Sequence, residues 1–227
     1  MREIVLDTET TGLSPADGHR VLEIGAVEII HQALTGKIFH RIINPERDVP
    51  EEAVRVHGHT AANLRDKPIF ASVVDDFLAF IGETRLVIHN AEFDMLFVNA
   101  ELARLGREPI SMARVVDTLA LARSKHPGQP NSLDALCDRY RINRSRRLKH
   151  GALVDAEILV EIYVELTGRQ RSLSFDERSA KGVPIVIPSR RTEPRRPRIF
   201  SIVAAEAAAH AEHVRALGAG AVWLRYA

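Results

Sequence analysis

The sequence predicts an α/β fold in which a mixed central sheet is flanked by helices. Two observations support this. Residues 1–44 contain three strand-like runs with short polar connections, and residues 69–167 alternate such runs with longer helical patterns. Short connections allow only antiparallel pairing, whereas strands separated by helices pair in parallel. One sheet that contains both kinds of pairing is therefore mixed.

The first three strands are expected at 2–7, 21–30 and 37–44. The connections TTGLSPADGHR and HQALTGK hold Gly, Pro and Asp turn residues and are too short for a helical crossover. These strands should therefore form an antiparallel meander.

The second part of the chain is expected to alternate helices and strands. The helix at 92–105 should end at Gly106 and carry an apolar stripe of Phe93, Leu96, Phe97 and Ala100. The other expected elements are a helix at 69–81, a strand at 85–89, a short strand near 114–117, and helices at about 118–124, 132–140 and 152–167, the last ended by Gly168.

Size and composition fit one substantial domain with an appendage. The 227 residues are 45% apolar and 27% charged, which is ordinary for a globular protein. A lone Cys137 excludes an internal disulfide framework and a cysteine zinc site. Neither a membrane-spanning run nor a signal peptide is visible, so we expect a cytoplasmic protein with reduced cysteine.

The charge divides the chain into different regions. Residues 1–168 carry 20 Lys/Arg and 25 Asp/Glu, a net of −5, whereas residues 169–227 carry 11 and 5, a net of +6. We expect a domain at 1–168, a flexible basic Pro/Arg linker at 169–198, and a tail at 199–227 with one Ala-rich helix. About 30 residues cannot build a stable core alone, so the tail should fold on a partner or pack back on its own domain.

A pair of carboxylates, Asp7 and Glu9, stands at the end of the first strand. Side chains two residues apart on a strand point the same way, and two such charges beside a buried strand are unfavourable without a cation between them. Asp94 and Asp155 are each expected in the first turn of a helix, where an acid is by default an ordinary cap. His150 should lie on the loop before the last helix, able to reach the site that Asp155 lines.

Four acids and a loop histidine suit metal-dependent phosphoryl chemistry. Carboxylates are hard oxygen ligands, right for Mg²⁺ or Mn²⁺ and poor for zinc. Two such ions about 4 Å apart can hold the attacking and leaving oxygens of an in-line displacement. A histidine, with an unperturbed pKa of about 6.5, can accept a proton from the attacking water.

The motifs VLDTETTGL, VIHNAEFD and HGALVDAE resemble, in order, the three exonuclease motifs of the DEDDh 3′–5′ exonuclease family. The stretches PEEAVRVHGHT, PNSLDALCDRY and AEILVEIYVELTG are similar to those of the proofreading epsilon subunits of bacterial DNA polymerase III. The resemblance covers residues 1–168 nearly continuously. It implies a ribonuclease H-like fold and removal of mispaired 3′-terminal nucleotides from DNA by two-metal hydrolysis.

The resemblance also implies roles for individual residues. Asp7, Glu9, Asp94 and Asp155 would bind two Mg²⁺ or Mn²⁺ ions, and His150 would be the general base. The residues implied to contact the 3′-terminal nucleotide are Thr8, Thr10, Thr11, Glu52 and His57, and those implied to face the substrate or support the site are His89, Asn90 and Phe93. Phe93 also belongs to the apolar stripe, so a core role remains open.

Basic and apolar segments outside these motifs suggest partners. The stretch DRYRINRSRRLKH, rich in Lys/Arg, could meet phosphates or be a solvated loop. Gln170, Leu173 and Phe175 within 170–175 resemble the motif by which bacterial replication proteins bind the sliding clamp. The segment 199–227 resembles the tail that binds the alpha (catalytic) subunit of the polymerase.

Two other functions are compatible with parts of the sequence. An exoribonuclease that trims RNA 3′ ends needs the same metal site, although it has no use for clamp and polymerase contacts. A non-enzymatic adaptor between polymerase and clamp would not need four acids and a histidine. Metal-dependent activity lost in an Asp7→Ala variant distinguishes an enzyme from an adaptor.

Overall fold

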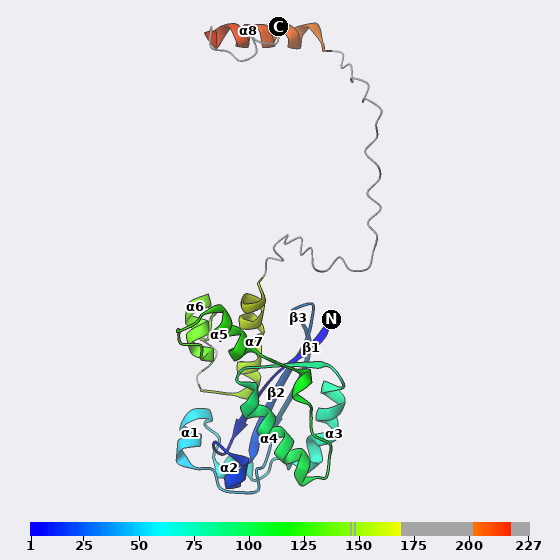
Figure 1. Ribbon diagram of the computed structural model, residues 1–227, viewed down its shortest axis with the longest axis vertical. Coiled ribbons are helices and arrows are strands. Elements are labelled where there is room, and N and C mark those ends of the chain that lie inside the picture. Colours follow the sequence, from blue (N-terminus) through cyan, green and yellow to red (C-terminus); the bar gives the residue numbers. More distant parts are fainter. Residues whose placement is uncertain (146, 148, 169–201, 219–227) are drawn as a thin grey trace. The chain divides into compact units, whose positions relative to one another are not determined.

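The computed structural model describes residues 1–145, 147, 149–168 and 202–218 (Figure 1). Within residues 1–168, the centre is a five-stranded sheet in the order β3-β2-β1-β4-β5. The strands are β1 (Arg2–Thr10), β2 (Val21–Ile30), β3 (Ala33–Ile42), β4 (Arg85–Ile88) and β5 (Val115–Asp117). β1 pairs antiparallel with β2 and β2 with β3, whereas β1–β4 and β4–β5 are parallel. The predicted meander and the mixed sheet are confirmed.

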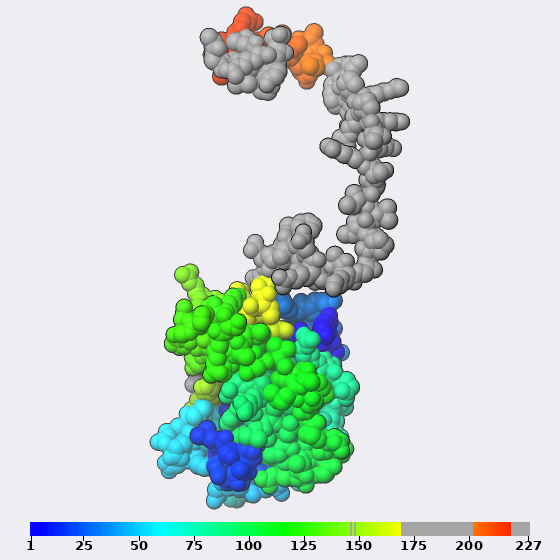
Figure 2. Space-filling view, viewed as in Figure 1, coloured from blue at the N-terminus to red at the C-terminus, as the bar shows by residue number. Residues whose placement is uncertain are grey.

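Helices cover both faces of this sheet (Figure 1). Figure 2 shows that residues coloured green, from the middle of the sequence, form much of the surface on the near side. One core lies between the sheet and α3 (Phe70–Ile81) and α4 (Ala91–Arg104), and Ile4 and Leu6 of β1 point into it. The other core contains Val5 of β1 and lies under α5 (Thr118–Lys125), α6 (Leu133–Tyr140) and α7 (Ala152–Thr167). Alternate residues of the central strand thus contribute to opposite cores, as strand geometry requires.

The central position of β1 and β2 explains why they are buried on both faces. Nine of the ten residues of β2 are buried, because the antiparallel partner β3 is the sheet edge and helices cover both faces. α7 packs especially close to β2 at Gly25: a Cβ placed there would lie 2.2 Å from the backbone carbonyl carbon of Ala152. This close approach brings the first turn of α7 onto the sheet.

The structure differs from the predicted elements in several places. β1 continues to Thr10, so Glu9 lies within the strand, and β3 begins at Ala33 instead of residue 37. Two short helices, α1 (Glu51–His57) and α2 (Ala61–Leu64), occupy a region for which no element was predicted. Leu96 is 52% exposed, so it is not part of a buried stripe. The connections also contain short 3₁₀ turns, η1 (Pro15–Asp17) and η2 (Met112–Arg114).

Residues 175–227 form a separate unit. The predicted Ala-rich helix is present there as α8 (Ala204–Ala216), and Val214 is its single buried residue. The predicted linker and the motif at 170–175 lie outside the described residues. Within the described ranges, none of the helices combines the length and the apolar character that crossing a membrane requires.

Candidate active site and metal centre

Asp7 and Glu9 project from β1 toward α7. They alternate with Thr8 along the strand and therefore share the face of Val5, which belongs to the core beneath that helix. Asp155 lies buried in the first turn of α7 and faces the same region. The two strand acids and the helix acid thus meet where α7 approaches the sheet.

Asp94 reaches the same place from the opposite layer. It is buried in the first turn of α4, and its Oδ1 accepts hydrogen bonds from Thr8 N at 3.0 Å and from Thr8 Oγ1 at 2.7 Å. Thr8 points away from the face of Asp7 and Glu9, so it ties the α4 carboxylate to the strand between them. All four predicted acids therefore converge.

His150 lies on the loop before α7, as predicted. Its backbone N donates to Val56 O of α1 at 3.2 Å, which fixes the loop against the neighbouring helix. Its Nδ1 lies 3.2 Å from Asp155 Oδ2, and its side chain is 44% exposed. Ligand atoms of Glu9, His150 and Asp155 all lie within 4.8 Å of one another, close enough to hold one metal ion.

Arg147 occupies this acidic centre, which the sequence did not predict. Its side chain is 6% exposed, with Nε 2.5 Å from Asp155 Oδ1 and Nη2 2.8 Å from Asp155 Oδ2. Nη1 lies 2.5 Å from Asp134 Oδ1, and Nη2 also lies 2.5 Å from His150 Nδ1. The basic stretch that contains Arg147 predicts either contact with phosphates or a solvated loop. In the structure Arg147 neutralises acids of its own domain instead.

The carboxylates carry the electrostatic signature of a cation site. Burial first, and then the neighbouring carboxylates, raise the pKa of Asp7 well above its ordinary value. Burial, and then the charge of Asp155, raises the pKa of Glu9 to about 8. Burial likewise raises the pKa of Asp94 to about 7, against the lowering effect of the hydrogen bonds from Thr8. A bound cation would favour the ionised form of each of these groups.

The donor set fits a hard divalent cation. It consists of carboxylate oxygens with one histidine nitrogen, the chemistry that Mg²⁺ and Mn²⁺ accept. The pair between Asp155 Oδ1 and Arg147 Nε lacks hydrogen-bond geometry, so both buried atoms are without a hydrogen-bond partner among the described residues. A metal ion at this oxygen would therefore compete with the Arg147 guanidinium for Asp155.

A cavity of about 640 Å³ opens beside these acids. It extends over residues 8–13 and α1, and several side chains predicted to contact substrate line it: Thr8, Thr10, Thr11, Glu52, His57 and Phe93. Thr10 Oγ1 donates to Gly12 O at 2.6 Å, and Thr11 Oγ1 lies 3.1 Å from His19 Nδ1, so both hydroxyls stabilise the turn that forms one wall. The cavity is large enough for a nucleotide-sized ligand.

His57 presents a buried donor in this cavity. His59 N donates to His57 Nδ1 at 3.0 Å, so the neutral ring carries its hydrogen on Nε2. Burial and the adjacent His59 lower the pKa of His57 to about 4, which keeps the ring neutral. Nε2 is buried and without a hydrogen-bond partner among the described residues. An acceptor on a ligand would satisfy it.

The other residues predicted to contact or face the substrate do not all lie in this cavity. Glu52 is exposed and pairs with Arg55 at 3.3 Å, and Phe93 packs on Phe97 with ring centroids 5.0 Å apart, so Phe93 combines a core contact with a cavity wall. His89 and Asn90 line a different cavity. The clamp-motif residues Gln170, Leu173 and Phe175 lie outside the described residues.

Asp117 is a supporting residue that the sequence reasoning missed. Its Oδ1 accepts from Asn90 N at 3.1 Å and from Leu119 N at 2.9 Å, so it joins the start of α4 to the start of α5. Asn90 precedes α4 in the left-handed conformation, with φ of 63°. An Asp directly before a predicted helix is a recognisable N-cap signal, so the capping role of Asp117 could have been predicted from the sequence.

Comparisons with known proteins show the family of this chain. A family model described as an exonuclease matches residues 4–163. The DNA polymerase III subunit epsilon of Rickettsia conorii is 52% identical over 184 residues, covering 79% of this chain and 80% of the relative. The subunit of the same name from Escherichia coli is 49% identical over 181 residues, covering 77% and 74%.

Solved structures show the same fold. Exonuclease X in complex with 5′-overhanging duplex DNA has a TM-score of 0.59 and 26% identity, covering 73% of this chain and 90% of that one. The nuclease domain of 3′hExo, a DEDDh family member bound to rAMP, has a TM-score of 0.61 and 17% identity, covering 73% and 91%. The ribonuclease H-like fold expected from the motifs is thereby confirmed.

Proposed function

This chain belongs to the exonuclease family, and from that premise we propose how its residues remove the terminal nucleotide of a DNA strand. It is a proofreading 3′–5′ exonuclease of the DNA polymerase III epsilon type, and it uses divalent metal ions. One observation carries the assignment of residues: four carboxylates from β1, α4 and α7 converge with His150 beside a nucleotide-sized cavity.

Asp7, Glu9, Asp94 and Asp155 would hold two Mg²⁺ or Mn²⁺ ions. When bound, these ions supply Lewis-acid stabilisation of the scissile phosphate and lower the pKa of the attacking water. The raised pKa values of Glu9 and Asp94 support this assignment, because such groups gain most from an added positive charge.

The terminal nucleotide is assigned to the cavity over residues 8–13. Its sugar or base would accept a hydrogen bond from His57 Nε2, the buried donor without a partner in the described part of the chain. Thr8 and Thr10 line the same cavity next to Glu9. Phe93 offers an aromatic face for stacking on the base.

His150 accepts the proton of the attacking water. As that proton leaves, the water oxygen bonds to phosphorus, and the bond between phosphorus and the 3′ oxygen of the preceding nucleotide breaks. The leaving oxygen takes a proton from solvent, which gives a strand shortened by one nucleotide and a nucleoside 5′-monophosphate. The exposure of His150 allows it to pass its proton to solvent before the next cycle.

Activity on labelled primers tests this proposal. The full chain is incubated with Mg²⁺ and a 3′-labelled primer that is paired, mispaired or made of RNA, with EDTA as the metal-free reaction. We expect faster loss of the mispaired DNA end, because a mispaired base costs less to unstack. Asp7→Ala should abolish the activity, whereas Asp75→Asn, at a position 74% exposed on α3, should leave it unchanged.

Three outcomes would contradict the proposal. Faster degradation of RNA than of DNA would assign the site to RNA trimming. Metal-dependent activity that survives Asp7→Ala would mean that these acids do not hold the metal. A chain inactive on every primer would act as an adaptor.

Partner contacts are proposed from the sequence. Residues 1–168, the exonuclease domain, carry a net charge of −5 and should bind free DNA weakly. We infer that the linker at 169–198 and the tail at 199–227 tether this domain to the polymerase alpha subunit. The motif at 170–175 would bind the sliding clamp. Tethering raises the effective concentration at a primer end to about the millimolar range.

Binding measurements test each contact separately. With the full chain immobilised, Leu173→Ala should weaken binding of the clamp, whereas Ile185→Ala in the same linker should not. Removal of 199–227 should abolish binding of the polymerase subunit and leave clamp binding intact. Equal clamp binding by the Leu173 and Ile185 variants would overturn the motif assignment.

A further inference from the structure

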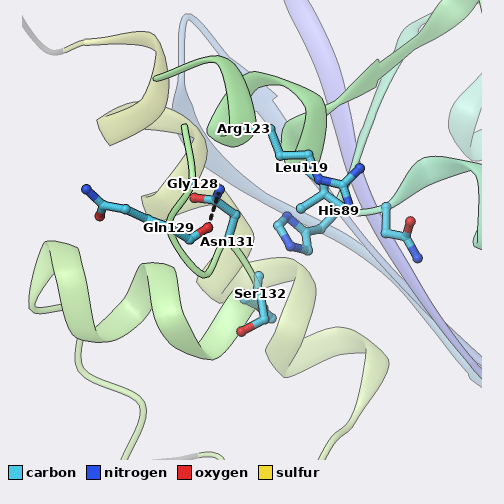
Figure 3. Close-up of a pocket in the computed structure, with 9 residues that line it drawn as sticks. His89, Leu119, Arg123, Gly128, Gln129, Asn131 and Ser132 are labelled. Carbon is cyan, nitrogen blue, oxygen red and sulfur yellow. Dashed lines mark hydrogen bonds between the residues drawn. The ribbon is translucent and has the colours of Figure 1, made fainter. Parts of the chain in front are cut away.

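A second cavity, of about 660 Å³, lies at the ends of β4 and β5 (Figure 3). In Figure 3, His89 and Arg123 lie on one side of it, and the loop of Gly128, Gln129 and Asn131 lies on the other. Ser132, which begins α6, contributes a further wall. The reaction described above uses none of its polar groups.

The pairing of the strands places this cavity next to the catalytic acids. β1 and β4 are parallel, with Val5 opposite Val87. Asp7 lies two residues beyond Val5, and His89 lies two residues beyond Val87, directly after the end of β4, so both follow the paired segment toward the same edge of the sheet. Val5 and Val87 share the core beneath α7, so both cavity and acids lie on that side of the sheet.

The start of α4 connects the two cavities. Asn90, which precedes this helix, lines the second cavity, and Phe93, three residues farther on, lines the first. Asp94 follows Phe93 directly and is one of the four acids. A strand whose last nucleotide fills the first cavity and whose scissile phosphate lies at the acids can therefore continue along the start of α4 toward the second cavity.

The lining of the second cavity suits an anion. It contains Arg123 and no Asp or Glu. Arg123 is exposed in the last turn of α5 and has no hydrogen-bond or ion-pair partner in the described part of the chain. Burial lowers the pKa of His89, so this ring is a neutral wall, and its Nδ1 lies 2.9 Å from Thr118 Oγ1.

The opposite wall is held by its own hydrogen bonds. Asn131 Nδ2 donates to His126 O at 3.2 Å and to Gln129 O at 2.9 Å, and its Oδ1 accepts from Arg139 Nη1 at 3.1 Å. The side chain of Gln129 points away from His89 (Figure 3). The cavity therefore has a fixed loop on one side. Arg123 is the charged hydrogen-bond donor among the residues that line the cavity.

We infer that this cavity binds the phosphodiester backbone of the substrate strand on the 5′ side of the scissile bond, with Arg123 donating to a phosphate. The inference rests on the proposed function, because it takes the direction of the strand from the placement of the terminal nucleotide. Arg123 acts on binding of the strand and takes no part in the chemical step.

Substrates with and without an upstream nucleotide test the inference. Thymidine 5′-(p-nitrophenyl phosphate) offers a terminal nucleotide and a leaving group but no 5′ portion, whereas an oligodeoxynucleotide offers all three. Arg123→Gln should lower kcat/KM for the oligonucleotide by about three- to tenfold, and Arg123→Lys should restore part of it. The slope of log(kcat/KM) against log salt should fall by about 0.7, the value for one phosphate contact on a single strand. The nitrophenyl ester should be cleaved at the wild-type rate.

Arg104→Gln is the matched control. Arg104 is also exposed in the last turn of a helix, at the end of α4 that is far from Asp94. The Arg104→Gln substitution therefore makes the same change in net charge as Arg123→Gln without altering the cavity. It should behave as wild type on both substrates. Thermal denaturation of each variant verifies that folding is unchanged.

Each result has a definite meaning. If Arg123→Gln lowers kcat/KM equally for the oligonucleotide and the nitrophenyl ester, or lowers it for neither, the inference is overturned. Failure of the wild type on every substrate would instead overturn the proposed function. Fluorescence anisotropy of a labelled octathymidylate in Ca²⁺, without turnover, still tests the cavity in that case: binding by Arg123→Gln as tight as by Arg104→Gln overturns it.

Discussion

Replacement of Gly25 by alanine should move Asp155 on α7 away from Asp7 on β1. Gly25 lies opposite Asp7 in the β1–β2 pairing, and the N-terminal turn of α7 rests on it. An added Cβ would lie 2.2 Å from Ala152 C and from Leu153 N, both backbone atoms that cannot rotate away. Since ordinary contact begins at 3.4 Å, the helix that carries Asp155 must move by about 1.2 Å, the difference between the two distances.

This displacement determines the expected magnitudes. Overpacking of a close contact costs about 1–3 kcal/mol, and each kcal/mol lowers the Tm of a domain of this size by about 2–4 °C. We therefore expect a Tm lower by about 2–12 °C. A shift of about 1 Å between catalytic groups can cost about 100-fold in rate, so kcat should fall far more than the loss of stability explains.

Thermal denaturation and primer degradation at a temperature well below both Tm values separate these effects. Gly151→Ala, at the start of the same helix, is the comparison, because its Cβ would meet only Glu23 Oε1, at 4.0 Å. Gly25→Ala should be the less stable of the two. A Gly25→Ala protein with the wild-type Tm and rate would refute the claim that close packing of α7 on β2 positions Asp155.

Three further results are expected. Arg147→Ala should lower the Mn²⁺ dissociation constant about tenfold in an electron paramagnetic resonance titration, because the guanidinium competes for Asp155; unchanged affinity would contradict this. In EDTA, Tm should fall as pH rises from 6.5 to 8. Burial raises the pKa of Glu9 from 4.5 to about 8, so the stability that this group contributes below pH 4.5 is lost as the folded protein is forced to ionise it. Mg²⁺ should remove the decline, and a rising Tm in EDTA would count against this reasoning. Arg20→Ala should cost about 3 kcal/mol in urea denaturation, because Arg20 pairs with both oxygens of buried Glu101 at 2.7 and 2.9 Å; a cost below about 1 kcal/mol would show that the pair contributes little.

Much of the site could be predicted because it depends on local rules. The spacing of Asp7 and Glu9 fixes a common face whatever the length of the strand. Asp94 and Asp155 stand in the first turns of helices of 14 and 16 residues, and these helices lie where predicted, within one or two residues. His150 precedes Gly151, the N-cap residue of α7, so its position on a loop followed from the helix boundary.

The rest depends on contacts between segments that are distant in sequence. α1 and α2 contain seven and four residues, too few to be stable alone. Tertiary contacts hold this region, including His59 against Glu23 and His150 N on Val56 O. Arg147 was missed for the same reason, since its place between Asp134 and Asp155 depends on the path of the loop and not on the basic composition around it.

The acids of this site come from three separate parts of the domain. Asp94 belongs to the layer of α3 and α4, Asp155 belongs to the layer of α5 to α7, and Asp7 stands on the sheet between them. A metal ion bound by all three would join the two cores, and at 100 times its dissociation constant it would add about 2.7 kcal/mol to the free energy of unfolding. Loss of either layer would remove one of its proposed ligands. A partly folded chain therefore cannot assemble the centre, so the capacity to cut DNA appears only in a molecule whose two cores are both complete.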